Sequence, residues 1–191
     1  MRKGLLIAVL VLVCGSFAIA QDYPKGELGA GWNYLHVDEG SGGTQNGLPG
    51  GFFVDGTYYF AKLIGLAGDF EYNKKTFSAD TNFTAGDQAR VLSFHAGPRV
   101  KARMGRFEPF AHALFGFTNA QFTPAGGTSV SDNAFSMKIG GGLDVAMVPH
   151  LALRLGEFNY YLTKFGTGST VNFNGQDHQN NFAFSVGVVL R

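Results

Sequence analysis

Short segments that alternate apolar and polar residues run through this chain, and they restrict its fold more than any other feature. The last of them is FAFSVGVVLR at residues 182–191, where every second residue from Phe182 to Leu190 is apolar. A period of two residues is typical of a β-strand whose two faces meet different surroundings. The pattern therefore predicts an all-β protein, and it raises the question of what the apolar face contacts.

The same alternation occurs in seven earlier segments, so the sequence predicts eight strands. The connections after the second, fourth and sixth strands are short, whereas the other connections are long and rich in glycine and polar residues. The chain has 28 glycines and 19 phenylalanines, and these residues favour turns and strands respectively. The seven earlier segments are residues 27–37, 51–61, 66–72, 92–101, 107–117, 135–145 and 151–160.

Two segments depart from a simple alternation. In the fifth, apolar side chains occupy both faces, and we favour the face of Phe115 and Phe117 as the apolar one. In the seventh, a one-residue β-bulge near Gly156 is needed to return Glu157 and Asn159 to the polar face.

The first 20 residues are predicted to be a secretory signal peptide. A basic start precedes an apolar run, and small residues lead to a cleavage site between Ala20 and Gln21. The apolar run is shorter than the roughly 20 residues that a membrane-spanning helix needs. The only cysteine, Cys14, would leave with this peptide. Residues 21–191 are therefore expected to form one barrel domain without disulfides or cysteine metal ligands.

Eight alternating strands fit two kinds of barrel, which differ in the face that points outward. A soluble, lipocalin-like ligand carrier turns its apolar face inward, whereas a membrane barrel turns it outward to lipid. Tyr58 and Phe60 lie beside a short turn, while Phe70 and Tyr72 lie near a long loop, so both ends of the apolar band carry aromatic rings. Such aromatic girdles, with strands of about ten residues, indicate an eight-stranded antiparallel, up-and-down transmembrane β-barrel.

In a membrane barrel the polar faces of the strands point into the lumen. These faces carry acidic and basic residues together, and an eight-stranded barrel has space inside only for side chains. We therefore expect a structural network of ion pairs and hydrogen bonds in place of an aqueous pore. The predicted lumen residues are Asp55, Asp69, Glu71, His95, Arg99, Lys101, Lys138, Asp144, Arg154 and Glu157.

Three blocks of the sequence resemble the small outer membrane β-barrel family of Gram-negative bacteria, which includes OmpA-like and OmpX-like barrels. The blocks are FEPFAHALFGFT at 107–118, NAFSMKIGGGLDVAMVPHLALRLGEFNYYLT at 133–163 and HQNNFAFSVGVVLR at 178–191. The resemblance implies a barrel with both termini in the periplasm, four surface loops and no peptidoglycan-binding domain. Chains of this family often end on an aromatic residue, and Arg191 departs from that pattern.

The resemblance also implies a role and a set of partners. The expected role is non-enzymatic, in envelope structure or in surface interaction such as adhesion. The expected partners are outer-membrane lipid, lipopolysaccharide and, during biogenesis, the barrel assembly machinery, with the protein a monomer and any surface ligand left open. Nucleic acid is not expected, because 15 lysine and arginine residues against 14 aspartate and glutamate residues leave no basic surface for it.

The alternative function is a lipid A-modifying outer-membrane enzyme, because deacylases of similar size use a serine, a histidine and a carboxylate. Ser93 and His95 lie two apart on one strand face, but that face is the one predicted to point into the lumen. The run GGGLD lacks the spacing of a phosphate-binding loop and lies within a strand. The five histidines show no ligand spacing, so neither a metal nor a cofactor is expected.

Overall fold

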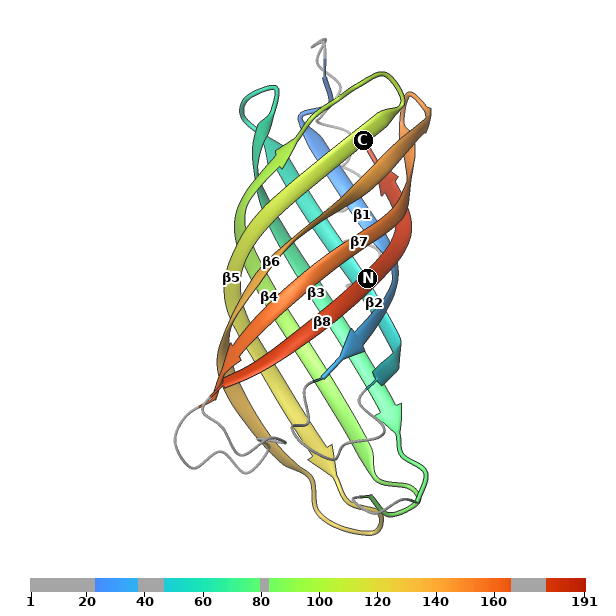
Figure 1. Ribbon diagram of the computed structural model, residues 1–191, viewed down its shortest axis with the longest axis vertical. Coiled ribbons are helices and arrows are strands. Elements are labelled where there is room, and N and C mark those ends of the chain that lie inside the picture. Colours follow the sequence, from blue (N-terminus) through green and yellow to red (C-terminus); the bar gives the residue numbers. More distant parts are fainter. Residues whose placement is uncertain (1–22, 38–46, 80–82, 166–177) are drawn as a thin grey trace, which may run out of the picture.

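The computed structural model describes residues 23–37, 47–79, 83–165 and 178–191. The predicted signal peptide and its cleavage site at Ala20 and Gln21 lie outside these residues. The described chain forms eight strands (Figure 1). They are β1 (Gly26–His36), β2 (Gly47–Tyr59), β3 (Ile64–Thr76), β4 (Gln88–Lys101), β5 (Phe107–Thr123), β6 (Val130–Val148), β7 (Leu151–Lys164) and β8 (His178–Leu190).

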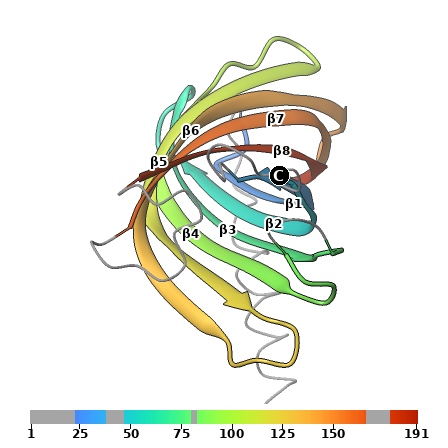
Figure 2. The ribbon, with the colours of Figure 1, turned by 60° about the horizontal axis from the view of Figure 1, so that its bottom comes forward.

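The eight strands close into one antiparallel barrel, in which each strand pairs with its neighbours in the chain. β1 pairs with β8 to complete the circle, with Leu28 opposite Leu190 and Trp32 opposite Val186. In Figure 2 the strands surround a single interior. The predicted eight-stranded up-and-down barrel is thus confirmed, and the segment FAFSVGVVLR closes it because it pairs with the first strand. Among the described residues, no helix has the length and apolar character needed to cross a bilayer.

The two ends of the barrel differ. The β2–β3, β4–β5 and β6–β7 connections lie at the same end as the C-terminus (Figure 1), and we call this the turn end. The last residues of β1, β3, β5 and β7 and the first residues of β2, β4, β6 and β8 lie at the opposite end, which we call the loop end. At the turn end the Arg191 guanidinium pairs with the carboxylate of Glu108 and lies 3.4 Å from the carbonyl oxygen of Val148.

The apolar face of each strand points outward. Phe94 on β4 and Phe158 on β7 are exposed on the outer wall, and the rings of Phe70 and Phe94 pack across β3 and β4 with centroids 4.8 Å apart. In β5 Phe117 is exposed, whereas Leu114 is fully buried, which confirms the phase favoured for that segment. The barrel therefore has an apolar outer wall, and its buried side chains lie in the interior.

The bulge predicted in the seventh strand is present. Arg154 lies opposite Gly187 and Glu157 lies opposite Ser185, so β7 has one more residue than β8 in this interval. As a result, Glu157 and Asn159 are both buried in the interior, together with Arg154. If the same residues of β7 alternated regularly, with no bulge, Glu157 would lie on the apolar outer wall.

Several strands are longer than the sequence pattern predicted. The fifth strand was expected to end near residue 117 and the sixth to begin near 135, but β5 continues to Thr123 and β6 begins at Val130. The added segments carry polar residues on their outward face, such as Asn119 and Gln121. Apolar and polar residues alternate only where the outward face of a strand meets an apolar surrounding. The sequence pattern therefore underestimated the length of strands that project beyond that surrounding. The connection expected to be long is therefore only residues 124–129.

Candidate functional site

The interior of the barrel holds a network of buried charges, with Asp55 of β2 at its centre. Arg99 of β4 places Nη1 2.5 Å from Oδ2 of Asp55, and Arg154 of β7 places Nη1 3.0 Å from Oδ1. Arg99 Nη1 also donates a hydrogen bond to Thr57 Oγ1 at 2.9 Å. Asp55 is 3% exposed and each arginine 1%, so one carboxylate joins two guanidinium groups away from solvent.

Arg154 extends the network to β6 and along β7 itself. Its Nε lies 2.9 Å from Asp144 Oδ1 on β6, and its Nη1 lies 2.7 Å from Glu157 Oε2 on β7. The face of the guanidinium packs on the inward ring of Phe110, whose centroid is 4.6 Å from Cζ. The bulge at Gly156 is what brings Arg154 and Glu157 to the same side of β7, and the ion pair between them depends on it.

A second group lies nearer the loop end, around Lys138 of β6. Its ammonium pairs with the carboxylates of Asp69 and Glu71 on β3, and Nζ lies 2.8 Å from Glu71 Oε1. The hydroxyl of Tyr161 on β7 donates a hydrogen bond to Glu71. In a closed ring of eight strands, β3 and β7 are on opposite sides, so this contact crosses the full width of the lumen.

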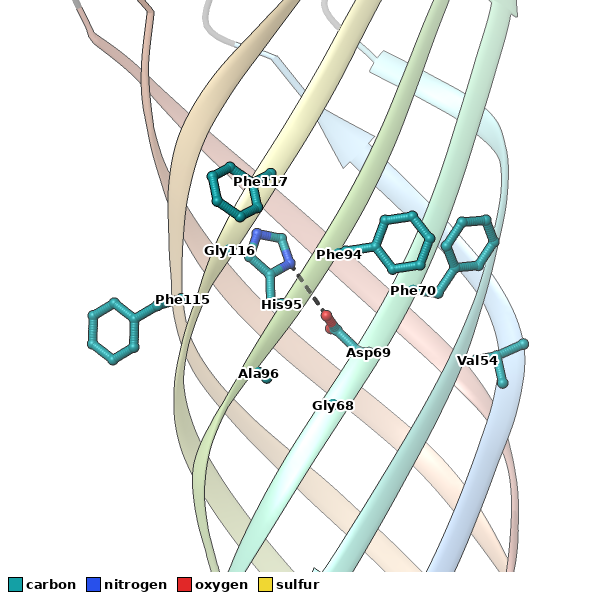
Figure 3. Close-up of a pocket in the computed structure, with 10 residues that line it drawn as sticks. All are labelled: Val54, Gly68, Asp69, Phe70, Phe94, His95, Ala96, Phe115, Gly116 and Phe117. Atoms are coloured by element: carbon teal, nitrogen blue, oxygen red, sulfur yellow. Dashed lines mark hydrogen bonds and ion pairs between the residues drawn. The ribbon is translucent and has the colours of Figure 1, made fainter.

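The pair Ser93 and His95, which raised the question of catalysis, lies inside the barrel. His95 Nδ1 is 3.2 Å from Asp69 Oδ1 (Figure 3), and its Nε2 is 2.8 Å from Ser136 Oγ. Ser93 Oγ instead lies 3.0 Å from Thr118 Oγ1. Ser93 and His95 therefore have different hydrogen-bond partners, and both are buried on the inward face as predicted.

The structure brings all ten predicted lumen residues into the interior, where each is at most 7% exposed. It adds two carboxylates and one histidine that the prediction left out: Glu27, Glu108 and His112. Glu27 Oε2 lies 2.5 Å from Lys101 Nζ, and the same ammonium lies 2.8 Å from Asp144 Oδ2. Glu27 and Glu108 are each the second residue of their strand, near the turn end. Their positions in the alternation of β1 and β5 would have identified them as inward residues.

The loop end of the interior has a different character. Buried apolar side chains gather there, a cluster that the sequence pattern did not predict. Phe77 belongs to it, and its ring stacks on that of Phe83 with centroids 3.9 Å apart. The cluster consists of Leu35, Val37, Leu48, Phe77, Ala89, Tyr161 and Ala183.

The network is arranged to hold the barrel wall together. Each strand from β1 to β7 contributes an ionisable member, and Ser185 on β8 donates a hydrogen bond to Asn33 Oδ1 on β1 at 2.8 Å. Within the described ranges, no group of three histidine, cysteine, aspartate or glutamate residues is placed to hold a metal ion. Paired charges in a space of low polarity stabilise a structure only when every partner is present.

Solved structures with the same fold are small barrels. Neisserial surface protein A has a TM-score of 0.62 at 15% identity, over 87% of this chain and 96% of that chain. Ail, the attachment invasion locus protein of Yersinia pestis, has a TM-score of 0.59 at 18% identity, over 86% of this chain and 96% of that chain. A comparison with curated proteins found no match at a significant level.

The sequence itself also matches a family. The family described as "Outer membrane protein beta-barrel domain" matches residues 5–191, which is nearly the whole chain. The outward apolar wall and the buried polar interior are the arrangement that such a barrel needs in lipid. The chain belongs to the outer membrane protein β-barrel domain family.

Proposed function

We propose that this protein is a non-enzymatic outer-membrane barrel that supports the envelope and displays its loop end for surface interaction. The observation that carries the proposal is the charge network, in which the inward polar residues are engaged with one another across the lumen. Eight-stranded barrels have interiors just wide enough for side chains, whereas water-filled channels occur with about 16 to 18 strands. The interior is therefore a structural plug, which leaves the outer wall and the loop end for function.

The orientation follows from the two ends. We place the turn end and both termini in the periplasm, with the loop end outside the cell, because outer-membrane barrels have short periplasmic turns and longer external loops. Export by a signal peptide over residues 1–20 is part of this proposal. A surface role is supported by the neighbour Ail, whose structure was solved in complex with the heparin analogue sucrose octasulfate.

The lipid-modifying alternative would need a serine, a histidine and a carboxylate that reach a lipid. Ser93, His95 and Asp69 face the interior, on the other side of the barrel wall from lipid. The soluble ligand carrier would need an apolar interior, whereas here the middle of the interior is charged and the outer wall is apolar. Both observations favour the non-enzymatic membrane barrel.

The orientation can be tested by cysteine labelling, since the only native cysteine, Cys14, lies in the predicted signal peptide. Thr128→Cys lies in the exposed connection at the loop end, and Arg106→Cys lies in an exposed turn at the turn end. A membrane-impermeant maleimide should label Thr128→Cys in intact cells and Arg106→Cys only after permeabilisation. The reverse pattern would overturn the orientation.

The role can be tested in cells from which the gene has been deleted. We expect higher sensitivity to detergent or weaker attachment to surfaces, with recovery when the wild-type gene is returned. No change in either property would contradict the proposed role. Mass spectrometry of lipid A should show the same species with and without the protein, and a new species that Ser93→Ala abolishes would show it to be an enzyme.

A further inference from the structure

Two cations lie side by side on the outer wall near the loop end. Lys74 on β3 and Arg90 on β4 are direct partners in the strand register, and both side chains are exposed. Neither side chain forms an ion pair or hydrogen bond with another described residue. Like charges placed directly opposite across two strands destabilise a sheet. The repulsion between the two cations would be relieved by an anion that comes from outside the described chain.

The charge distribution of the strands supports an external anion. Seven carboxylates of the strands are buried in the interior, and the eighth, Asp132, pairs in register with the buried, inward Ala120. The exposed cations at the loop ends of the strands include Lys74, Arg90 and Lys164. Among the described strand residues, the outer wall thus carries cations at the loop end and no carboxylate. The buried carboxylates are Glu27, Asp55, Asp69, Glu71, Glu108, Asp144 and Glu157.

The cations stand at the edge of the apolar wall. The next outward pair towards the turn end is Tyr72 opposite Leu92, and the pair after that is Phe70 opposite Phe94. The ring of Phe52 stacks on Tyr72 with centroids 5.5 Å apart. Lys74 and Arg90 are thus the first outward pair beyond the last apolar pair, two residues further along each strand, where a membrane's polar headgroups begin.

A hollow opens in the apolar wall on the turn-end side of Tyr72 and Phe52. It has a volume of about 530 Å³, and Gly68 and Ala96 lie between the side chains of Val54, Phe70, Phe94 and Phe115 (Figure 3). A methyl group added at Gly68 would have its nearest neighbour, the His95 carbonyl oxygen, 3.8 Å away, so the space is open. Gly68 and Lys74 are separated along β3 by about 20 Å of strand. An extended hydrocarbon chain that starts at the headgroup level could follow β3 into this hollow.

We propose that Lys74 and Arg90 bind a phosphate of outer-leaflet lipid A, and that one of its acyl chains runs past Tyr72 and Phe70 into the hollow over Gly68 and Ala96. The assignment to the outer leaflet rests on the proposed orientation, with the loop end outside. Lipid A fits because it combines phosphate groups at the headgroup level with several acyl chains. Lysine and arginine together bind a phosphate through charge-assisted hydrogen bonds.

The test compares the affinity of the purified barrel in detergent micelles for diphosphoryl lipid A and for dephosphorylated lipid A. The double variant Lys74→Gln/Arg90→Gln should bind diphosphoryl lipid A about thirtyfold more weakly, because each basic residue near an anionic surface contributes about 1 kcal/mol. It should bind dephosphorylated lipid A as the wild type does. The matched control is Lys62→Gln/Arg106→Gln, which removes two exposed cations at the turn end and should leave both affinities unchanged.

A third variant tests the acyl-chain part of the site. Gly68→Leu fills the hollow without altering charge, and it should weaken the binding of both lipids several-fold. Unchanged binding in Gly68→Leu would remove the hollow from the site. Unchanged binding of diphosphoryl lipid A in the double variant, or an equal loss in the turn-end control, would overturn the phosphate site. Equal competition by phosphatidylglycerol would show a general preference for anionic lipid and would overturn the assignment to lipid A.

These outcomes are separate from those that test the proposed function. Labelling of Thr128→Cys only after permeabilisation, with phosphate-dependent binding retained, would overturn the orientation and leave the phosphate site standing. Labelling of Thr128→Cys from outside, with binding unchanged in the double variant, would overturn the lipid A site alone.

Discussion

Arg99 Nη1 lies 2.5 Å from Asp55 Oδ2, although β3 stands between the strands that carry them. The same carboxylate receives Arg154 from β7, three strands away around the ring. Asp55 thus connects parts of the wall that share no backbone hydrogen bonds. We therefore expect Asp55 to contribute more to the stability of the barrel than its backbone pairing with β1 and β3 alone would.

Replacement of Asp55 by alanine should strongly destabilise the barrel. The change leaves Arg99 and Arg154 buried with one fewer counter-charge, and the removal of one partner from a buried pair costs about 3–5 kcal/mol. The free energy of unfolding can be measured in micelles with urea, followed by the fluorescence of Trp32, the only tryptophan. Asp132→Ala, at a half-buried site near the loop end, should cost less than about 1 kcal/mol. Equal losses in the two variants would contradict a central role for Asp55.

Two glycines, Gly116 on β5 and Gly68 on β3, should respond differently to a methyl group. At Gly116 the added carbon would lie 1.8 Å from the Phe94 carbonyl oxygen, so Gly116→Ala must push β4 and β5 apart. Such overpacking costs about 1–3 kcal/mol. Gly68→Ala has open space on the outer wall and should be neutral or stabilising by about 0.5 kcal/mol, through the lower entropy of the unfolded chain. The same urea titration measures both, and a larger loss in Gly68→Ala would contradict the described packing.

Deletion of Asn159 should prevent correct assembly. After this deletion β7 can keep its later residues in phase with β8 only by losing the bulge, and a regular strand then turns Glu157 to the outer wall and Phe158 into the interior. A polar group left unpaired in an apolar surrounding costs about 1–3 kcal/mol, and several side chains change sides at once. The folded form should disappear from a gel run without heating, on which folded barrels migrate differently from unfolded ones. Deletion of Gly127, in the loop-end connection, is the control that should retain that form.

A charge placed on the outer wall should show where the apolar band ends. Ala96→Arg puts a cation midway between the outward residues Leu92 and Val100 of β4 and should cost about 2–4 kcal/mol in lipid bilayers. Gln121→Arg, on the outward face of β5 beyond the apolar residues, should cost less than about 1 kcal/mol. Unfolding in phospholipid vesicles measures both values. A similar cost at the two sites would mean that the apolar band extends further towards the loop end than described.

The fold could be predicted from the sequence pattern because, over most of each strand, one face is apolar and points outward and the other is polar and points inward. Alternation alone identified the eight strands, the outward face of β5 and the bulge at Gly156. The ends of β5 and β6 were missed because residues such as Asn119 and Ser131 face polar surroundings, and there the contrast between the two faces disappears.

The interior was predictable as a set of residues and not as a set of contacts. The alternation shows that Glu71 and Tyr161 point inward, but their strands are on opposite sides of the ring, and no local spacing relates them. The apolar cluster at the loop end was missed for a related reason. Leu35 and Ala183 occupy a face that is polar along most of its length, so the average character of that face conceals them.

The charge network also bears on how the chain enters a membrane. Glu27 and Asp55 are on β1 and β2, but their counter-charges, Lys101 and Arg99, are both on β4. A hairpin of the first two strands that entered hydrocarbon alone would carry two unpaired carboxylates, besides two edges of unpaired backbone. Stepwise entry of single hairpins is therefore unfavourable at every stage until the later strands arrive. We therefore expect insertion and folding of this chain to be one concerted event.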